Sequence, residues 1–191
     1  MENQIGLYQE FEAQHLIVSL RAMNPGKARN EAVLQLHKQA ENWLAENAHL
    51  GIYIKGNIPS AKNSKEIGMY KKYVPDDNNP FNKKGILKEF RTLQDSAITK
   101  EYRLTSRPQW IDNAKRFKSL SEGLKMPLNV EFTFIRDTLR RFDYHNAVQI
   151  CADIMVESGY IIDDETCYLK PVFGDVYYSK SLAGVVIKIL K

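Results

Sequence analysis

Two adjacent stretches decide how this chain is expected to fold: residues 129–136, with the sequence NVEFTFIR, and residues 146–158, with the sequence NAVQICADIMVES. In the first stretch apolar and polar residues alternate, which is the period-2 pattern of a half-buried strand. In the second, apolar residues recur at helical spacing, and Gly159 follows as a residue type that often ends a helix. The sequence therefore predicts a strand that leads into a helix.

Acidic residues lie at the ends of both predicted elements. Asp143 falls between the strand and the helix, and Asp153 lies on the polar face of the helix. Asp163 and Asp164 follow a short apolar run, residues 160–162, which we expect to form a β segment beside the first strand. Carboxylates that converge in this way resist joint ionisation unless a cation neutralises them. Magnesium prefers oxygen ligands and serves phosphoryl transfer, so the acids predict a metal site for phosphodiester cleavage.

A second interpretation of the same acids needs no metal ion. Acidic residues on a helix face are most often solvated, and the Asp163-Asp164 pair also suits a turn. The chain would then be a structural or interaction protein whose acids only keep one helix face soluble.

The ordered polar residues of this region resemble the signature of the RusA-type Holliday junction resolvases, in which an Arg-Asp-x-Asp-Asn segment opens a helix and an Asp-Asp pair follows it. The residues that carry the resemblance are Arg141, Asp143, Asn146, Asp153, Asp163 and Asp164. Residues 56–64, GNIPSAKNS, resemble the Pro-Ser-x-Lys-Asn segment of phage-encoded members. Residues 110–117 resemble the helix before the acidic strand, and residues 184–189 resemble the closing strand. The resemblance covers about residues 51–190.

The resemblance implies an α+β fold over residues 51–191, a RusA-like mixed β-sheet packed with helices. It also implies a homodimer that resolves Holliday junctions and other branched DNA by metal-dependent phosphodiester hydrolysis, in DNA recombination and repair. Mg²⁺ or Mn²⁺ would be the cofactor, and a two-fold dimer suits paired cuts in a four-way junction. The residues it assigns to catalysis are Asp143, Asp164, Asp163 and Asn146, and those it assigns to the metal ion are Asp143, His145, Asp164 and Asp153.

Two positions depart from the family pattern. His145 stands where members carry a second aspartate, and Gln149 stands where they carry a lysine on the helix. A neutral imidazole binds divalent ions, more readily manganese or zinc than magnesium, but a histidine at a helix start is equally suited to solvent. Gln149 lacks the charge with which a lysine would stabilise the transition state. The alternative is therefore a catalytically impaired relative that binds branched DNA without cutting it.

Basic residues gather upstream of the acidic motif and directly before it. Residues 62–91 contain eight Lys or Arg residues with Tyr70 and Tyr73 among them, and this stretch, with a turn-rich segment over residues 74–82, is predicted to be a loop. Tyrosine rings suit stacking on unpaired bases. The residues expected to bind DNA phosphates are Lys62, Lys65, Lys71, Lys72, Arg140 and Arg141. The net charge of +4 favours a polyanionic partner only weakly.

Residues 1–50 match nothing in the family and are predicted to be an N-terminal helical extension to the nuclease domain. Apolar spacing indicates one helix from about residue 6 and a second that contains residues 33–44, with a break at residues 24–26. Within the main domain, Ser106 and Pro108 are expected to open the helix that precedes the acidic strand.

The cellular setting is predicted from the cysteines and from the absence of targeting signals. Cys151 and Cys167 fall in a predicted helix and strand, so both are expected to be buried thiols in a reduced chain. The first residues are polar, and no apolar run is long enough to span a bilayer. We therefore expect a cytoplasmic protein without a membrane partner.

Overall fold

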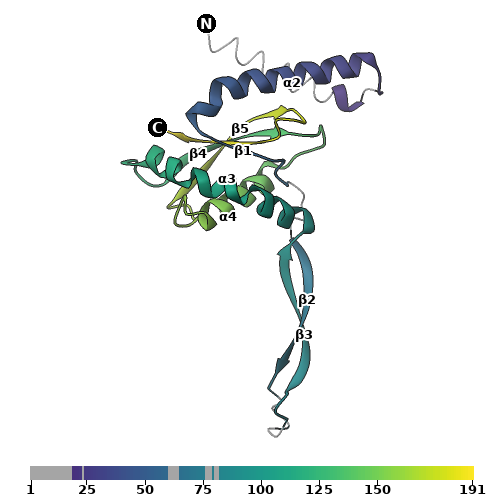
Figure 1. Cartoon of the computed structure of the whole chain (residues 1–191), viewed down its shortest axis with the longest axis vertical. Coiled ribbons are helices and arrows are strands. Elements are labelled where there is room, and N and C mark those ends of the chain that lie inside the picture. The colour runs from purple at the N-terminus through teal and green to yellow at the C-terminus, as the bar shows by residue number, and fades with distance from the viewer. Residues whose placement is uncertain (1–18, 23, 60–64, 76–78, 80–81) are drawn as a thin grey trace.

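The computed structural model, which describes residues 19–22, 24–59, 65–75, 79 and 82–191, confirms the strand predicted over residues 129–136. That strand, β4, is an inner strand of a four-stranded sheet with the order β1-β6-β4-β5 (Figure 1). β4 pairs antiparallel with β6 and parallel with β5, and β1 pairs antiparallel with β6. The fold is therefore α+β with a mixed sheet. The strands are β1 (Ile52–Lys55), β4 (Leu128–Arg136), β5 (Leu169–Tyr178) and β6 (Gly184–Leu190).

Helices cover both faces of this sheet. α3 (Ala97–Ser121) and α4 (Tyr144–Glu157) lie on one side, and α2 (Lys27–Asn47), which continues as the short helix η1 (Ala48–Leu50), lies on the other (Figure 1). The alternating pattern predicted that β4 would be buried on one face. Because helices cover both faces of the sheet, β4 is buried on both. Phe132 and Phe134 are fully buried, and so is Ile135, whose side chain points to the opposite face of the sheet.

The core beneath α3 is built around aromatic side chains. Trp110 and Phe117, seven residues apart on one face of α3, are both fully buried. Tyr160 packs against both rings, with centroid distances of 5.7 Å and 4.9 Å, and its hydroxyl donates a hydrogen bond of 2.8 Å to the Trp110 carbonyl. The same helix therefore fixes the chain segment that follows α4.

α2 confirms the second helix predicted in the N-terminal region. It packs against β5, where the Trp43 ring stacks on Tyr177 at a centroid distance of 4.8 Å and the His37 ring lies within 2.7 Å of the Ser179 hydroxyl. Residues 19–22 are helical, and Leu20 is buried against α2. Most of the first predicted helix lies outside the described residues.

The lysine-rich stretch is not the loop that the sequence suggested. β2 (Lys65–Val74) and β3 (Ile86–Asp95) form an antiparallel two-stranded hairpin that extends away from the body of the molecule (Figure 1). The loop prediction was wrong because the apolar residues of this stretch are not confined to one face of the strands. The sequence therefore shows no pattern of a half-buried strand. The turn-rich segment falls largely between the two strands, which fits its Pro and Asn content.

α3 begins about ten residues earlier than Ser106 and Pro108 indicated. Ser96 is its N-cap, and the Ser96 hydroxyl accepts the Thr99 backbone N–H. Pro108 lies inside the helix, where it removes the hydrogen bond to the carbonyl of Leu104 on the exposed side. The Ser106 hydroxyl donates to the Tyr102 carbonyl at 2.7 Å. This serine therefore forms a hydrogen bond within the helix and does not cap its N-terminus.

The segment between α4 and β5 differs from its prediction in two ways. Residues 160–162 form a turn rather than a strand, although Gly159 ends α4 as expected, with a φ of 73°. Cys167 is exposed in the following turn, near Glu165, and not buried in a strand. Cys151 is buried as predicted, and that burial raises the pKa of its thiol, which stays protonated at neutral pH.

Two neighbouring residues of α3 test how much the core contributes to stability. Replacing the fully buried Trp110 with alanine should lower the free energy of unfolding by about 3–5 kcal/mol, because it removes a large side chain and leaves a cavity. Ile111→Ala is the matched control, since Ile111 is 51% exposed and should change stability by less than about 0.5 kcal/mol. Denaturant titration measures the free energy of unfolding of both variants. An equal loss of stability in the two would contradict the placement of Trp110 in the core.

Candidate functional site

The structure places Asp143 where the acidic motif predicted it, at the start of the helix that follows β4. β4 ends at Arg136, a six-residue loop over residues 137–142 follows, and Asp143 is the N-cap of α4. Its Oδ1 accepts the backbone N–H of His145 at 3.1 Å. Aspartate is favoured at this position because its carboxylate accepts an N–H group that has no partner within the helix.

Two aromatic residues flank Asp143 and fix its position on the body. Phe142 packs edge-on against Phe134 of β4, and the guanidinium of Arg136 lies 4.7 Å above the Phe142 ring. The Tyr144 hydroxyl donates to the Gly174 carbonyl of β5 at 2.7 Å. Burial raises the pKa of Tyr144 to about 12, so its phenol stays a donor at neutral pH. Asp143 is thus held between two anchored residues while its own side chain remains 46% exposed.

His145 lies beside Asp143 on the first turn of α4. Its Nδ1 is 3.9 Å from Asp143 Oδ1, and its ring packs edge-on against Phe173 of β5. The His145 side chain is 83% exposed. A carboxylate and an imidazole therefore face solvent together at the N-terminus of a helix, where partial positive charge attracts anions. Asn146 follows in the same turn and is partly buried, and Gln149 is exposed one turn later.

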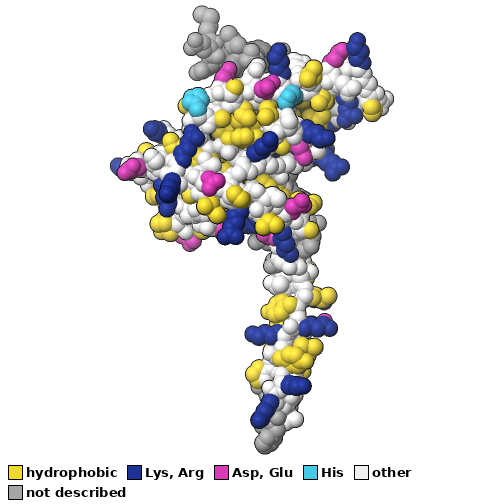
Figure 2. Space-filling view, viewed as in Figure 1, with side chains coloured by type: hydrophobic (Ala, Val, Ile, Leu, Met, Phe, Trp, Pro, Cys, Tyr) yellow, Lys and Arg dark blue, Asp and Glu magenta, His cyan; other side chains and the backbone are white. Residues whose placement is uncertain are grey.

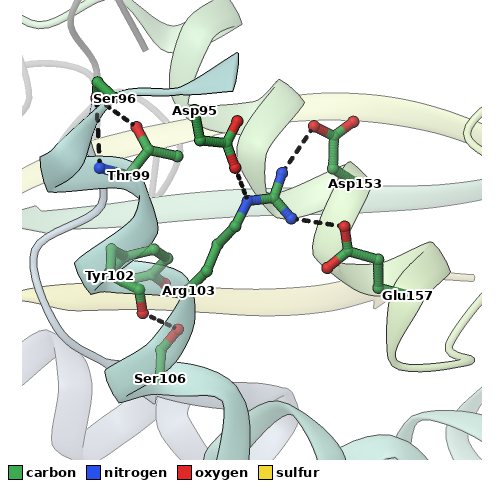
Figure 3. A network of polar contacts seen from close by, with 8 residues as sticks. All are labelled: Asp95, Ser96, Thr99, Tyr102, Arg103, Ser106, Asp153 and Glu157. Atoms are coloured by element: carbon green, nitrogen blue, oxygen red, sulfur yellow. Dashed lines mark hydrogen bonds and ion pairs between the residues drawn. The ribbon is translucent and has the colours of Figure 1, made fainter. Parts of the chain in front are cut away.

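Asp153 was predicted to point back toward Asp143, and the structure shows that it does not. Asp153 is ten positions further along the chain than Asp143, which places the two about 15 Å apart along the axis of α4. Asp153 instead lies against α3, where its Oδ2 is 3.0 Å from Nη2 of Arg103 (Figure 3). Its carboxylate therefore forms an ion pair with an arginine.

Arg103 binds three carboxylates from two elements, β3 and α4. Besides Asp153, its Nη1 donates to Glu157 at 2.7 Å, and its Nε forms an ion pair with Asp95, the last residue of β3, at 2.8 Å (Figure 3). The Arg103 side chain is only 19% exposed, so water screens these pairs less than it would at the surface. The guanidinium thereby ties the base of the hairpin to α4. Sequence spacing could not reveal the contact with α4, since its two carboxylates are 50 and 54 residues from Arg103 in the chain.

Asp163 and Asp164 lie in the turn between α4 and β5. Asp163 Oδ1 accepts the backbone N–H of Glu165 at 3.1 Å, which makes it a turn-stabilising residue, and Asp164 is exposed. β5 begins at Leu169, which pairs with Leu128 at the start of β4, whereas Asp143 follows the other end of that strand. Among the residues the structure describes, no three His, Cys, Asp or Glu side chains come together as a group that could hold a metal ion.

The predicted DNA-binding residues fall on two separate surfaces. Arg140 and Arg141 are exposed in the loop before Asp143, and Arg21 supports that loop through hydrogen bonds to the carbonyls of Leu139 and Arg140. Lys71 and Lys72 are exposed on β2 of the hairpin. Lys65 begins β2 but its side chain is not described, and Lys62 lies outside the described residues.

Comparison with known proteins adds no identification. The chain matches no protein-family model, and it matches no curated protein. The resemblance to the RusA-type resolvases therefore stays a prediction from the residues of the acidic motif. Within the described residues, no helix is long and apolar enough to cross a membrane.

The Arg103 cluster generates a stability prediction. Arg103→Met keeps much of the side-chain volume but leaves three carboxylates without their cation, so the free energy of unfolding should fall by about 1–3 kcal/mol. Arg103→Lys should recover part of this loss, because an ammonium keeps the charge but cannot contact all three partners as a guanidinium does. Lys27→Met is the matched control, since Lys27 and its partner Glu31 are 92% and 67% exposed. If Arg103→Met and Lys27→Met unfold at the same denaturant concentration, the cluster does not stabilise the fold.

Proposed function

We propose that this chain is a metal-dependent endonuclease that cuts branched DNA, with the four-way junction as its substrate and a RusA-like fold. The observation that carries the proposal is the exposed Asp143–His145 pair at the N-terminus of α4, with Arg140 and Arg141 in the preceding loop. Such a surface offers ligands for a cation and positive charge for a phosphate at one place.

The residues at this place fit a divalent cation. Magnesium is commonly held by one or two carboxylates, with water and substrate phosphates completing its shell, so a site with few protein ligands is sufficient. Asp143 and His145 would hold the ion, which when bound would activate a water for attack on phosphorus. A histidine ligand favours Mn²⁺ more than an aspartate does.

The chain's own residues would position the DNA around this place. Arg140 and Arg141 would bind phosphates on the side of the loop, and the N–H groups at the start of α4 would attract a phosphate oxygen. Asn146 would orient a ligand or a water. Asp163 and Asp164 belong to the proposal through the resemblance, and Asp153 would act indirectly, by holding α4 against Arg103.

A homodimer completes the proposal, because resolution of a four-way junction needs two paired cuts related by two-fold symmetry. A reduced, cytoplasmic setting in DNA recombination or repair is consistent with the buried thiol of Cys151.

A second candidate is a relative that binds branched DNA without cutting it. It is favoured by the ion pair that Asp153 forms with Arg103, and by the fact that no three His, Cys, Asp or Glu side chains of the described residues come together to hold a metal ion. It is also favoured by Gln149, which supplies no positive charge near a scissile phosphate. Metal-independent junction binding without any cleavage would support this candidate.

Cleavage of a synthetic four-way junction tests the first candidate. Wild-type protein should cut the junction with Mg²⁺ or Mn²⁺ and leave a linear duplex of the same sequence intact. Asp143→Asn should slow cutting about a hundredfold or more, since even outer-shell partners of a metal ion contribute 10–100-fold. Asp164→Asn tests the residue that the resemblance assigns, and Asp112→Asn, at an exposed acid of α3, is the control that should keep full activity. A junction left intact by wild type with both metals would reject the enzyme.

The identity of residue 145 should set the metal preference. His145→Asp restores a hard oxygen ligand beside Asp143, so cutting with Mg²⁺ should rise relative to cutting with Mn²⁺. His49→Asp, at an exposed histidine in η1, makes the same chemical change away from the site and should alter neither rate. The ratio of initial rates in the two metals is the readout, and an unchanged ratio in His145→Asp would show that residue 145 is no ligand.

A further inference from the structure

The hairpin formed by β2 and β3 exposes apolar and aromatic side chains on both of its faces. Residues directly opposite each other share a face, so Tyr70 and Phe90 lie together on one face, and Tyr73 and Leu87 lie together on the other. Tyr70 is 49% exposed, Tyr73 59% and Met69 71%. In the described part of the chain this sheet has only two strands. Two-stranded sheets are marginally stable alone in water, so an arm of this kind is suited to a partner that covers it.

The charges on the hairpin indicate which kind of partner. Among the side chains described between residues 67 and 92, six are cationic and one, Glu89, is anionic. Basic side chains and apolar side chains alternate along the arm (Figure 2). Lys72 and Lys88 face each other across the two strands, a like-charge pair that costs stability unless an anion lies between them. The six cationic residues are Lys71, Lys72, Lys83, Lys84, Lys88 and Arg91.

A second copy of the hairpin is a poor match for this surface. Two copies packed face to face would bring their lysines together, and exposed lysines along both edge strands oppose pairing by edges. A nucleic acid is a good match, since its phosphates neutralise lysines and its bases cover flat aromatic rings. Tyr70 and Phe90 already provide such a surface, because their rings stack at a centroid distance of 5.4 Å and an interplanar angle of 20°.

We propose that the β2–β3 hairpin is a DNA-binding arm that engages unpaired bases at a branch point, with Tyr70 as the stacking residue and Lys72 and Lys88 on the flanking phosphates. The inference deepens the proposed function, since it names the feature of branched DNA that is recognised, but it does not require that the chain cuts DNA. The ion pair between Asp95 and Arg103 holds the base of the arm against α4. An arm fixed in this way would place a branch point at a set distance from Asp143.

The test is DNA binding by the full-length protein in EDTA, where no metal-dependent cutting interferes. Fluorescently labelled four-way junction, forked duplex, single strand and linear duplex are titrated at several salt concentrations. Lys72→Gln/Lys88→Gln should weaken binding to all four and reduce the slope of log K against log [salt] by about two. Lys38→Gln/Lys125→Gln makes the same charge change at exposed positions of α2 and of the loop after α3, and should leave the slope unchanged.

The stacking role is tested on the two faces separately. Tyr70→Ala should weaken binding to the forked duplex and the junction about tenfold, with little effect on linear duplex, and Tyr70→Phe should restore it because the ring remains. Met69→Ala removes an exposed apolar side chain from the opposite face of the same hairpin and is the matched control. All six substituted positions are exposed on the surface, and circular dichroism confirms that each variant is folded.

Three outcomes overturn the inference: no binding of any DNA by the wild type, equal effects of the hairpin and control lysine substitutions, or a loss of dimer mass in Tyr70→Ala without a change in DNA affinity. The last outcome would show that a second copy of the chain, and not DNA, covers the hairpin. Failure of the nuclease is seen separately, because wild type would then leave the junction intact with Mg²⁺ and Mn²⁺ while these binding differences persist.

Discussion

The ion-pair cluster of Arg103 joins the three parts of the molecule on which function would depend. Through one guanidinium, α3 contacts the last residue of β3 and two carboxylates of α4. Three negative charges around one positive charge are tolerated because the cluster is open to water at Glu157, which is 63% exposed, while the arginine itself is largely covered. The base of the hairpin and the polar face of α4 thereby contact the same side chain.

Much of the body could be predicted from the sequence, because its elements bury one face or both. The period-2 pattern gave β4, the helical spacing gave α2 and α4, and Gly159 gave the end of α4. The hairpin was missed for the complementary reason. Neither of its faces is buried by the body, so apolar and charged side chains are mixed on both, and no periodicity marks it. The start of α3 was missed because Pro108 is tolerated within the helix.

The candidate site could likewise be predicted from the sequence only in part. Asp143 was predictable, since an aspartate between a strand and a helix is a favoured N-cap, and its neighbour His145 follows from adjacency in the chain. The fate of Asp153 was not predictable. Its face of α4 was identified correctly, but the partner on that face is an arginine of another helix, and helical spacing carries no information about which element packs there. The proposed function therefore depends on a smaller set of residues than the motif alone suggested.

The strand order has a consequence for how the protein is made. β6 lies between β1 and β4, so the sheet remains split until the segment beginning at Gly184 inserts between strands synthesised much earlier. During synthesis β1 has no sheet partner, and one edge of β4 stays open. Pairings so distant in sequence are slow to form, and open edges invite wrong partners. A chaperone that shields the edge of β4 until translation reaches β6 would therefore raise the yield of folded protein more than one acting on the hairpin, whose strands pair locally.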